Sequence, residues 1–541
     1  MAAPSQTGQI TLRGTPASPG LAAGPIVFIG ESGRTNTDSN AAPPEEEATR
    51  LRDALDEAVA DLSRILDDTH DDEASGMIEF QIAMLEDDSL TEPTFGAIAL
   101  GSPAVTAWQE NLDAEIEGYR ASDDEYFQAR AIDLEDIRDR VLQHLRGDTE
   151  DEFTSGAIVV CDELSPSRFL EHRERIAGIA SQRGSSSSHV AILARAQGVP
   201  MLIRVQECAA DAGASALLDA RTGRLTLHPG AEALAEFERL RAADEHERLA
   251  AEVHRHRDAH LPSGERVLVL VNVAGPDELT DLDPTTCDGI GLVRTEFLFD
   301  ARASLPDEDE QFSVYSKIVR WADGRPVTIR TLDAGGDKPI PGLTVDGELN
   351  PFLGVRGVRL SLRRPEVFKT QIRALVRTAR LGPVKVMLPM VTEPWELERA
   401  RGLIADALVE MGGTRDETLP FELGIMVEVP ACAMDVNRFD ADFFSIGSND
   451  LLQYVTACGR DSGELEEVAR PDNPALLSLI QDVVAKAGDR GKGVSLCGDM
   501  GGDPRYLPLL LERGVRTVSV SPAAIARTKA AVANHGSRSD G

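Results

Sequence analysis

Lysine is scarce in this sequence, and paired cysteines are missing from it. The chain of 541 residues has seven lysines, none before Lys317, so 48 of its 55 basic residues are arginine. Its six cysteines are scattered without a Cys-x-x-Cys pair, which argues against zinc, iron–sulfur clusters and a secreted disulfide framework. No stretch approaches the ~18 apolar residues of a membrane span, and the start lacks a signal-peptide pattern. These absences predict a soluble, cytoplasmic protein with reduced thiols.

The charge balance excludes two classes of partner. The 55 basic residues face 91 acidic ones, which gives a formal net charge of −36. Nucleic acids and anionic membranes are polyanions, so we expect no nucleic-acid partner and no membrane insertion. Acidic excess with few lysines also fits a halophilic protein, because concentrated salt screens the repulsion between carboxylates. A phosphorylated substrate would need a local basic pocket.

The pattern of apolar residues changes along the chain and predicts an α/β multidomain protein of two to four domains. Short apolar runs in residues 8–29 indicate strands, whereas residues 44–146 have helical periodicity. Strand-like runs return between residues 157 and 230, so a helical block is inserted into a small α/β domain. The charged, alanine-rich residues 231–260 predict a connecting helix or, equally well, a surface helix of a neighbouring domain.

Eight apolar strand candidates follow Pro262, separated by stretches long enough for helices. They span residues 266–273, 289–293, 326–331, 384–390, 423–429, 442–447, 493–497 and 515–521. Eight such units predict a (β/α)8 TIM barrel, whose chemistry lies at the carboxyl ends of the strands. The polar residues at those ends are Asn272, Arg294, Arg330, Glu428, Asn449, Asp450 and Cys497.

The predicted barrel mouth combines arginines with two carboxylates. Arg294 and Arg330 end strands, and Arg356 and Arg460 follow in neighbouring segments. The planar guanidinium group suits phosphate and carboxylate oxygens, so the set indicates a small ligand with two or three negative charges. Glu428 and Asp450 would supply oxygen ligands for Mg2+. An ion pair at the barrel rim explains any single one of these residues equally well, but not the whole set.

Two further side chains are candidates for chemistry. Cys497 ends a strand beside glycines, where its thiol would face a ligand, although a lone cysteine is more often a small buried hydrophobe. In GSSSSHVAILAR, residues 184–195, His189 lies between a small-residue loop and an apolar helix start. A neutral imidazole is a competent nucleophile near neutral pH. The alternative for His189 is a buried core histidine.

Many segments resemble Enzyme I of the phosphoenolpyruvate-dependent sugar phosphotransferase system, and the likeness runs over nearly the whole chain. They include TPASPGLAAGP, IEFQIAMLEDDSL, DELSPSRF, GSSSSHVAILARAQGVP, GIGLVRTEFLF, RTLDAGGDK, NPFLGVRGVRL, GIMVEVPA, FFSIGSNDLLQY and CGDMGGD. The resemblance implies a swivelling phosphohistidine domain (1–30 and 147–230) with an inserted helical domain (31–146) that binds a carrier protein. A linker helix (231–262) and a barrel that binds phosphoenolpyruvate (PEP; 263–541) would follow.

The same resemblance implies an activity, a cofactor and partners. A phosphoenolpyruvate–protein phosphotransferase moves the phosphoryl group of PEP to Nε2 of His189, releases pyruvate, and then phosphorylates the histidine-containing phosphocarrier protein (HPr). This would be the first step of sugar uptake. Cys497 resembles the family's proton donor, Glu428 and Asp450 resemble its Mg2+ ligands, and a homodimer is expected. The implied PEP-binding residues are Arg294, Arg330, Asn449, Asp450 and Arg460, with Arg356 and Lys338 as supporting contacts.

Some positions depart from the family pattern and leave an alternative open. The family has a basic residue and a threonine in the loop before its histidine, where this chain has only serines from Ser185 to Ser188. Asp499 stands where glutamate is common. A regulatory paralogue that senses PEP without transferring phosphate is therefore the alternative, although such a sensor needs no proton donor. Pyruvate phosphate dikinase would need a large ATP-grasp domain, and a pyruvate kinase would have no use for His189.

Overall fold

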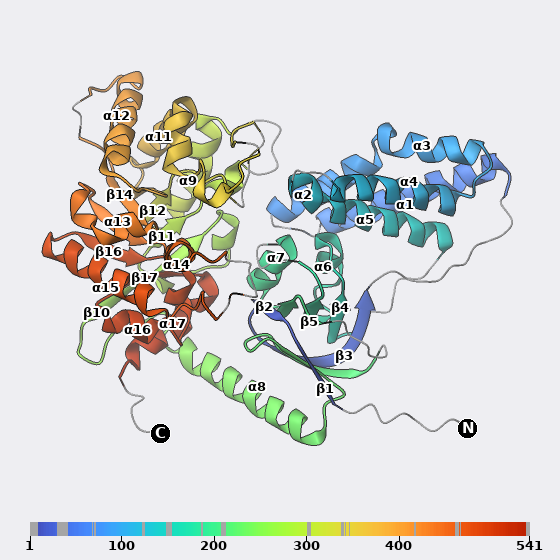
Figure 1. Ribbon diagram of the computed structural model, residues 1–541, viewed down its shortest axis with the longest axis horizontal. Helices are drawn as coiled ribbons and strands as arrows, with labels where there is room; N and C mark the ends of the chain where they lie inside the picture. The colour runs from blue at the N-terminus through green and yellow to red at the C-terminus, as the bar shows by residue number, and fades with distance from the viewer. Residues whose placement is uncertain are drawn as a thin grey trace. The chain divides into compact units, whose positions relative to one another are not determined.

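The computed structural model describes most of the chain, which forms two compact units, Met1–Ala243 and Asp244–Gly541 (Figure 1). The described residues are 9–29, 42–67, 69, 72–121, 125–147, 154–184, 188–206, 213–299, 305–336, 340, 342–345, 347–415, 418–459, 465 and 467–536. Within them, no helix is both long enough and apolar enough to cross a membrane.

An eight-stranded mixed sheet underlies the N-terminal unit, in the order β1-β8-β7-β3-β4-β5-β6-β2. Strands β3 to β6 run parallel, and the outer pairings are antiparallel. The strands are β1 (Ile10–Arg13), β2 (Thr15–Ser18), β3 (Leu21–Ile29), β4 (Ala157–Cys161), β5 (Ile176–Ser181), β6 (Met201–Ile203), β7 (Ser215–Asp219) and β8 (Arg224–Leu227). Helix α6 (Pro166–His172) joins β4 to β5, and α7 (His189–Gln197) joins β5 to β6.

The predicted helical segment 44–146 is confirmed as five helices inserted between β3 and β4, drawn from blue to teal in Figure 1. They are α1 (Pro44–Asp67), α2 (Asp72–Leu85), α3 (Asp88–Ala99), α4 (Ala104–Arg120) and α5 (Glu125–Arg146). Their apolar faces belong to one continuous core with β4, β5, α6 and α7, including Trp108, Leu134, Phe169 and Val190. The helical block and its host sheet therefore form one packed body.

A buried carboxylate fastens the helical block to α6. Asp136 of α5 accepts hydrogen bonds from the hydroxyl groups of Ser165, at 2.7 Å, and Ser167, and Arg168 Nε lies 3.4 Å from it. We expect Asp136→Ala to lower the unfolding free energy of the N-terminal unit by about 2–4 kcal/mol, because three buried or half-buried donors lose their acceptor. Urea denaturation would measure the change.

Asp139→Ala on the same helix is the matched control, because its side chain is 40% exposed. A change within about 0.5 kcal/mol is expected for it. Equal urea midpoints for the two variants would contradict a fastening role for Asp136.

The connecting helix is shorter than the pattern of residues 231–260 predicts. Helix α8 (Ala231–Glu252) is followed by turns and by β9 (Ala259–His260), which pairs antiparallel with the first barrel strand. The buried ammonium group of Lys529 donates a hydrogen bond of 2.9 Å to the carbonyl of Arg255. These tertiary contacts replace the helical hydrogen bonds that the local sequence favours.

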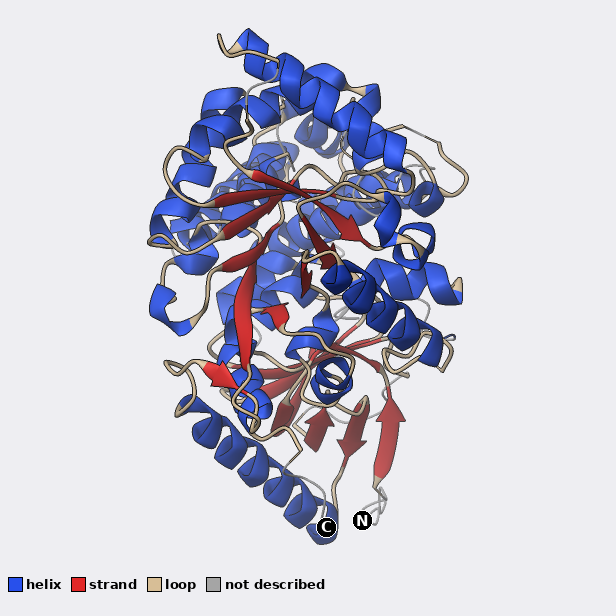
Figure 2. Cartoon of the chain, turned by 90° about the vertical axis from the view of Figure 1, so that its left-hand side faces the viewer, coloured by secondary structure: helices blue, strands red, loops and turns tan. Residues whose placement is uncertain are grey.

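The C-terminal unit is a closed barrel of eight parallel strands, which confirms all eight strand predictions (Figure 2). The strands are β10 (Arg266–Val273), β11 (Ile290–Val293), β12 (Val327–Arg330), β13 (Val384–Leu388), β14 (Glu422–Val427), β15 (Phe443–Ile446), β16 (Gly493–Leu496) and β17 (Thr517–Val520). The surrounding helices are α9 (Glu308–Trp321), α10 (Val358–Arg363), α11 (Pro365–Thr378), α12 (Pro394–Glu410), α13 (Pro430–Met434), α14 (Ser448–Thr456), α15 (Pro474–Asp489), α16 (Leu507–Glu512) and α17 (Ile525–Ala533).

Successive residues of each barrel strand point alternately into the barrel interior and toward the surrounding helices. The large core between strands and helices contains Phe444 and Ile446 of β15. A separate small cluster contains Phe443 of β15 with Leu292, Met387, Met426 and Cys497 from four other strands or strand ends. Because side chains alternate along a strand, this second cluster fills the interior of the barrel beneath its mouth.

Candidate functional site

Two buried arginines at the carboxyl end of the barrel are held by acidic side chains. Arg330, the last residue of β12, lies 2.9 Å from Glu296 and 3.1 Å from Asp333. Arg356 makes two hydrogen bonds to Asp333, of 3.2 and 2.9 Å, and its third nitrogen lies 3.4 Å from Asp450. This network fixes both guanidinium planes before any ligand binds.

Electrostatics keep these arginines charged despite burial. Burial by itself would lower the pKa of the Arg330 guanidinium, but the charges of Glu296 and Asp333 more than offset it and raise the pKa. For Arg356, Asp333 and Asp450 likewise outweigh burial and raise the pKa. The three carboxylates offset these positive charges, so an anion would be bound through guanidinium N–H groups such as Arg330 Nε, which has no hydrogen-bond partner among the described residues.

Arg294, directly after β11, is the third arginine of the mouth. Its side chain is exposed and, within the part of the chain that the structure describes, it has no ion-pair partner. It is close enough to Cys497 to lower the pKa of that thiol. The predicted grouping of Arg294, Arg330 and Arg356 around one mouth therefore has support from the geometry.

Asn449 is held in place by Asp499, a residue of the loop after β16. Its amide group donates to the Asp499 carboxylate at 3.0 Å, and the Asp499 backbone N–H donates to the amide oxygen at 3.1 Å. Gly498 permits this close approach, since a Cβ there would lie 1.8 Å from the hydroxyl oxygen of Ser448. Asn449 is half-buried and Asp499 is exposed.

The two predicted metal ligands differ in where they lie. Glu428 directly follows β14, whereas Asp450 is in the first turn of α14 and does not end a strand as the sequence pattern suggested. Glu428 is fully buried, and its Oε1 accepts a hydrogen bond of 2.6 Å from the Met390 backbone. Its Oε2 has no hydrogen-bond partner among the described residues. Burial, followed by the charges of Asp450 and Asp333, raises the pKa of Glu428 to about 8.

These carboxylates fit a hard divalent cation. An unpartnered buried carboxylate oxygen beside a second carboxylate is costly unless a proton or a cation compensates it. Among the described residues no group of three or more His, Cys, Asp or Glu side chains forms a metal cage. Mg2+ is commonly held by one or two carboxylates plus substrate oxygens and water, so a two-carboxylate site suits it.

The Cys497 thiol is buried beside the arginine network. Burial raises its pKa to about 11, although a hydrogen bond with Ser445 and the charges of Arg330 and Arg294 oppose that shift. The thiol donates a weak hydrogen bond of 3.6 Å to the Ile446 carbonyl. A thiol that stays protonated at neutral pH is suited to donating a proton and unsuited to acting as a resting nucleophile.

His189 begins helix α7 of the N-terminal unit, as the sequence predicts. Ser188 caps this helix, and its hydroxyl oxygen accepts a hydrogen bond of 3.4 Å from the Ala191 backbone. The His189 side chain, Lys338, Arg460 and the serines at 185–187 lie outside what the structure describes. Their roles remain predictions.

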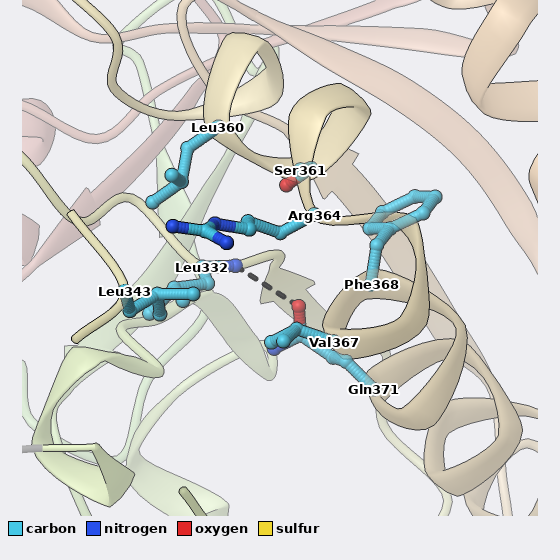
Figure 3. A pocket seen from close by; sticks show the side chains of 8 residues that line it. All are labelled: Leu332, Leu343, Leu360, Ser361, Arg364, Val367, Phe368 and Gln371. Atoms are coloured by element: carbon cyan, nitrogen blue, oxygen red, sulfur yellow. Dashed lines mark hydrogen bonds between the residues drawn. The ribbon is translucent and has the colours of Figure 1, made fainter. Parts of the chain in front are cut away.

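A small cavity lies beside Leu332, in the loop after β12, and none of its lining residues belongs to the arginine network. Figure 3 shows it lined by Leu332, Leu343, Leu360 and Arg364, with the Gln371 side-chain oxygen accepting a hydrogen bond of 3.0 Å from the Leu332 backbone. Its volume of about 10 Å³ admits at most one water molecule. This cavity is therefore a packing feature and not a substrate pocket.

Three family descriptions match consecutive parts of the chain. The PEP-utilising enzyme PEP-binding domain matches residues 248–537, the N-terminal domain matches 13–130, and the mobile domain matches 153–223. The phosphoenolpyruvate-protein phosphotransferase of Listeria innocua is 33% identical over 535 residues, which covers 96% of this chain and 93% of that protein. The chain belongs to the phosphoenolpyruvate-protein phosphotransferase family. It is therefore a PEP-utilising transferase.

A second relative of this family agrees. The phosphoenolpyruvate-protein phosphotransferase of Geobacillus stearothermophilus is 34% identical over 536 residues, which covers 96% of this chain and 92% of that protein. A solved structure titled N-terminal domain of Enzyme 1 - Nitrogen is 26% identical, with a TM-score of 0.32, over 42% of this chain and 98% of that chain. Membership of the phosphotransferase family rests on the sequence relatives and the domain matches.

Sequence reasoning missed the residues that hold the arginines. Glu296 and Asp333 are buried, and each lies two or three positions after a strand-end arginine, in RTEF and RTLD. That spacing was a usable signal, because a carboxylate just beyond a buried arginine is well placed to neutralise it. Glu296 of the first motif pairs with Arg330 of the second, and Asp333 pairs with Arg330 of its own motif and with Arg356.

Proposed function

We propose that this protein transfers the phosphoryl group of PEP to Nε2 of His189, releases pyruvate, and then phosphorylates HPr. The observation that carries the proposal is the joint burial of Arg330, Arg356, Glu428 and Cys497 at one barrel mouth. Fixed positive charge, an unpartnered carboxylate oxygen and a protonated thiol are the groups that cleavage of PEP requires. The alternative of a PEP sensor does not explain the thiol.

Each residue at the mouth has a separate task in this proposal. Arg330 and Arg356 bind phosphate and carboxylate oxygens of PEP with guanidinium planes already oriented, and exposed Arg294 adds a contact from the rim. Asn449 donates from its amide group, and Lys338 and Arg460 complete the set as the resemblance implies. Glu428 and Asp450 would hold Mg2+, which, when bound, would neutralise phosphoryl charge and polarise the bridging oxygen.

The transfer itself exchanges one bond for another. Nε2 of His189 forms a bond to phosphorus while the bond between phosphorus and the enol oxygen breaks, which leaves the enolate of pyruvate. Cys497 then gives its thiol proton to the methylene carbon, and pyruvate departs. His189 belongs to one unit and the arginines to the other, so the reaction requires that the start of α7 reach the barrel mouth.

The N-terminal unit would serve the second half of the reaction. The amino end of α7 carries partial positive charge, which stabilises a phosphoryl group on His189. HPr would dock on the helical block α1 to α5, whose helices share a core with α7. A homodimer formed through the barrel and a cytoplasmic location complete the proposal, both as the resemblance implies.

Phosphorylation of His189 tests the proposal directly. The wild-type protein and His189→Ala would each be incubated with PEP and Mg2+ in high salt, and intact mass and pyruvate would be followed. Acid-labile phosphate and pyruvate with the wild type only are expected. PEP binding without phosphate on either protein would overturn phosphotransfer and favour the sensor.

The proposed halophilic character predicts a stability that depends on salt. Raising KCl from 0.1 to 1 M shortens the Debye length from about 10 Å to about 3 Å, which weakens repulsion within a chain of net charge −36. We therefore expect Tm to rise with KCl, and calorimetry would measure it. Sucrose at equal osmolality is the control. A Tm in 0.1 M KCl equal to the Tm in 1 M KCl would contradict halophilic adaptation.

A further inference from the structure

Two serines line the barrel interior next to Cys497. Ser445 lies two residues after Phe443, a member of the interior cluster, and Ser495 lies two residues before Cys497, another member. Because successive strand residues alternate between faces, both serines point inward with that cluster. They are paired in register across β15 and β16, and the hydroxyl of Ser495 donates to the hydroxyl oxygen of Ser445 at 3.0 Å.

The two hydroxyl groups form a directed chain that ends at sulfur. Ser445 is fully buried, and its hydroxyl lies close enough to the Cys497 thiol to lower the pKa of that thiol. Cys497 lies two residues after Ser495 on the same face of β16, diagonally across from Ser445. Since Ser495 donates to Ser445, the proton of Ser445 is free to point at sulfur. Ser495 itself is only partly buried. The chain thus runs from a hydroxyl within reach of solvent to a thiol that is 5% exposed.

The two serines differ from the other buried serine of the interior in being connected. The neighbouring interior side chains include the apolar Leu292, Met387, Met426 and Phe443, and also Ser519, which is fully buried and has no hydrogen-bond partner among the described residues. Ser445, in contrast, accepts a hydrogen bond from Ser495 and lies beside Cys497. A connected pair of polar groups that reaches a reactive thiol indicates a role for that pair.

We propose that Ser495 and Ser445 relay a proton from solvent to Cys497 after each turnover. This inference rests on the proposed function, in which Cys497 gives up its proton to the enolate of pyruvate. The thiolate left behind then takes the proton of Ser445 as that oxygen takes the proton of Ser495. Ser495 in turn takes one from solvent water, so that both hydroxyls are restored and the net step adds one solvent proton to sulfur.

Isotope exchange tests the relay without a carrier protein. The protein would be incubated with PEP, [14C]pyruvate and Mg2+ in D2O, and two quantities would be followed: 14C transferred to PEP and deuterium entering the pyruvate methyl group. With the relay intact, deuterium from the solvent replaces the thiol proton between successive forward and reverse reactions. Deuterium therefore enters the pyruvate methyl group while 14C enters PEP. We expect Ser495→Ala to lower the ratio of deuterium to 14C several-fold and to slow the exchange about tenfold.

Matched variants separate a relay from a structural role. Ser495→Thr keeps the hydroxyl and is expected to restore the ratio to within about twofold of the wild type, whereas Ser445→Ala should lower it at least as much as Ser495→Ala. A ratio that is the same in Ser495→Ala and the wild type would overturn the relay even if 14C exchange is normal. Absence of 14C exchange in the wild type would instead refute the proposed phosphotransfer, so the two failures are distinguishable.

Discussion

Cys497→Ala is expected to lower the rate of pyruvate formation by about 10²–10⁴-fold, the range that a positioned general acid contributes. Without the thiol, the enolate has no proton donor at its methylene carbon and returns its oxygen to phosphorus instead. PEP binding should be unchanged, because the groups proposed to bind PEP are the arginines, which acidic side chains and not Cys497 hold in place. Rapid-quench measurement of pyruvate and calorimetric titration with PEP would give the two quantities.

Cys287→Ala is the matched control for this prediction. Cys287 is also buried in the barrel unit, but its hydrogen-bond partners are the Pro284 carbonyl and the Gly289 backbone, in the loop before β11 and at the opposite end of that strand from Arg294. Pyruvate formation at the wild-type rate is expected for this control. An equal loss in both variants would show that packing, and not proton donation, explains the effect.

Glu428→Gln is expected to remove a large pH dependence of stability. The pKa of Glu428 is raised to about 8 in the folded protein, against an ordinary value of 4.5, so the folded state binds this proton more tightly than the unfolded state does. Stability from this group is therefore full below pH 4.5 and is lost as pH rises to 8, where a buried carboxylate becomes charged. Without divalent cations, wild-type Tm should fall by several degrees relative to the variant between pH 5 and pH 8.5.

Added Mg2+ should raise the Tm of the wild type above that of Glu428→Gln at pH 8.5. A cation on Glu428 and Asp450 would stabilise the charged wild-type site at pH 8.5, whereas the neutral amide would gain little. Glu398→Gln, an exposed position on α12, should behave as the wild type throughout. If Tm changes with pH in the same way for the wild type and Glu428→Gln in the presence of EDTA, the raised pKa of Glu428 is disproved. If Mg2+ raises the Tm of both proteins equally, Glu428 is not a Mg2+ ligand.

The sequence predicted the elements of this fold well because most of them are strongly patterned. Eight short apolar runs such as residues 266–273 have no competing interpretation once helix-length spacers separate them, and helical periodicity marked the segment 44–146 as a whole. The end of α8 was not predictable, since residues 253–260 leave the helix only through β9 pairing with β10 and the contact of Lys529 with Arg255. Those contacts join residues far apart in the sequence.

The candidate site was likewise predictable from the sequence only in part. Arg330 and Glu428 were identified because they end or follow strands, and barrel strands meet at one mouth. Which carboxylate holds which arginine was not predictable, because it depends on barrel register and loop geometry. The serine chain was equally hidden, since Ser445 and Ser495 are 50 residues apart and meet only through strand pairing.

The common core of the helical block and its host α/β domain has an evolutionary consequence. Since Trp108 and Leu134 of the insertion pack in one cluster with Phe169 and Val190 of the host, neither side can change size without the other. A chimera that exchanges residues 44–146 alone should fold poorly, whereas exchange of the whole unit up to Ala243 should not. We therefore expect the proposed docking site for a carrier protein and His189, the residue proposed to phosphorylate it, to be inherited together.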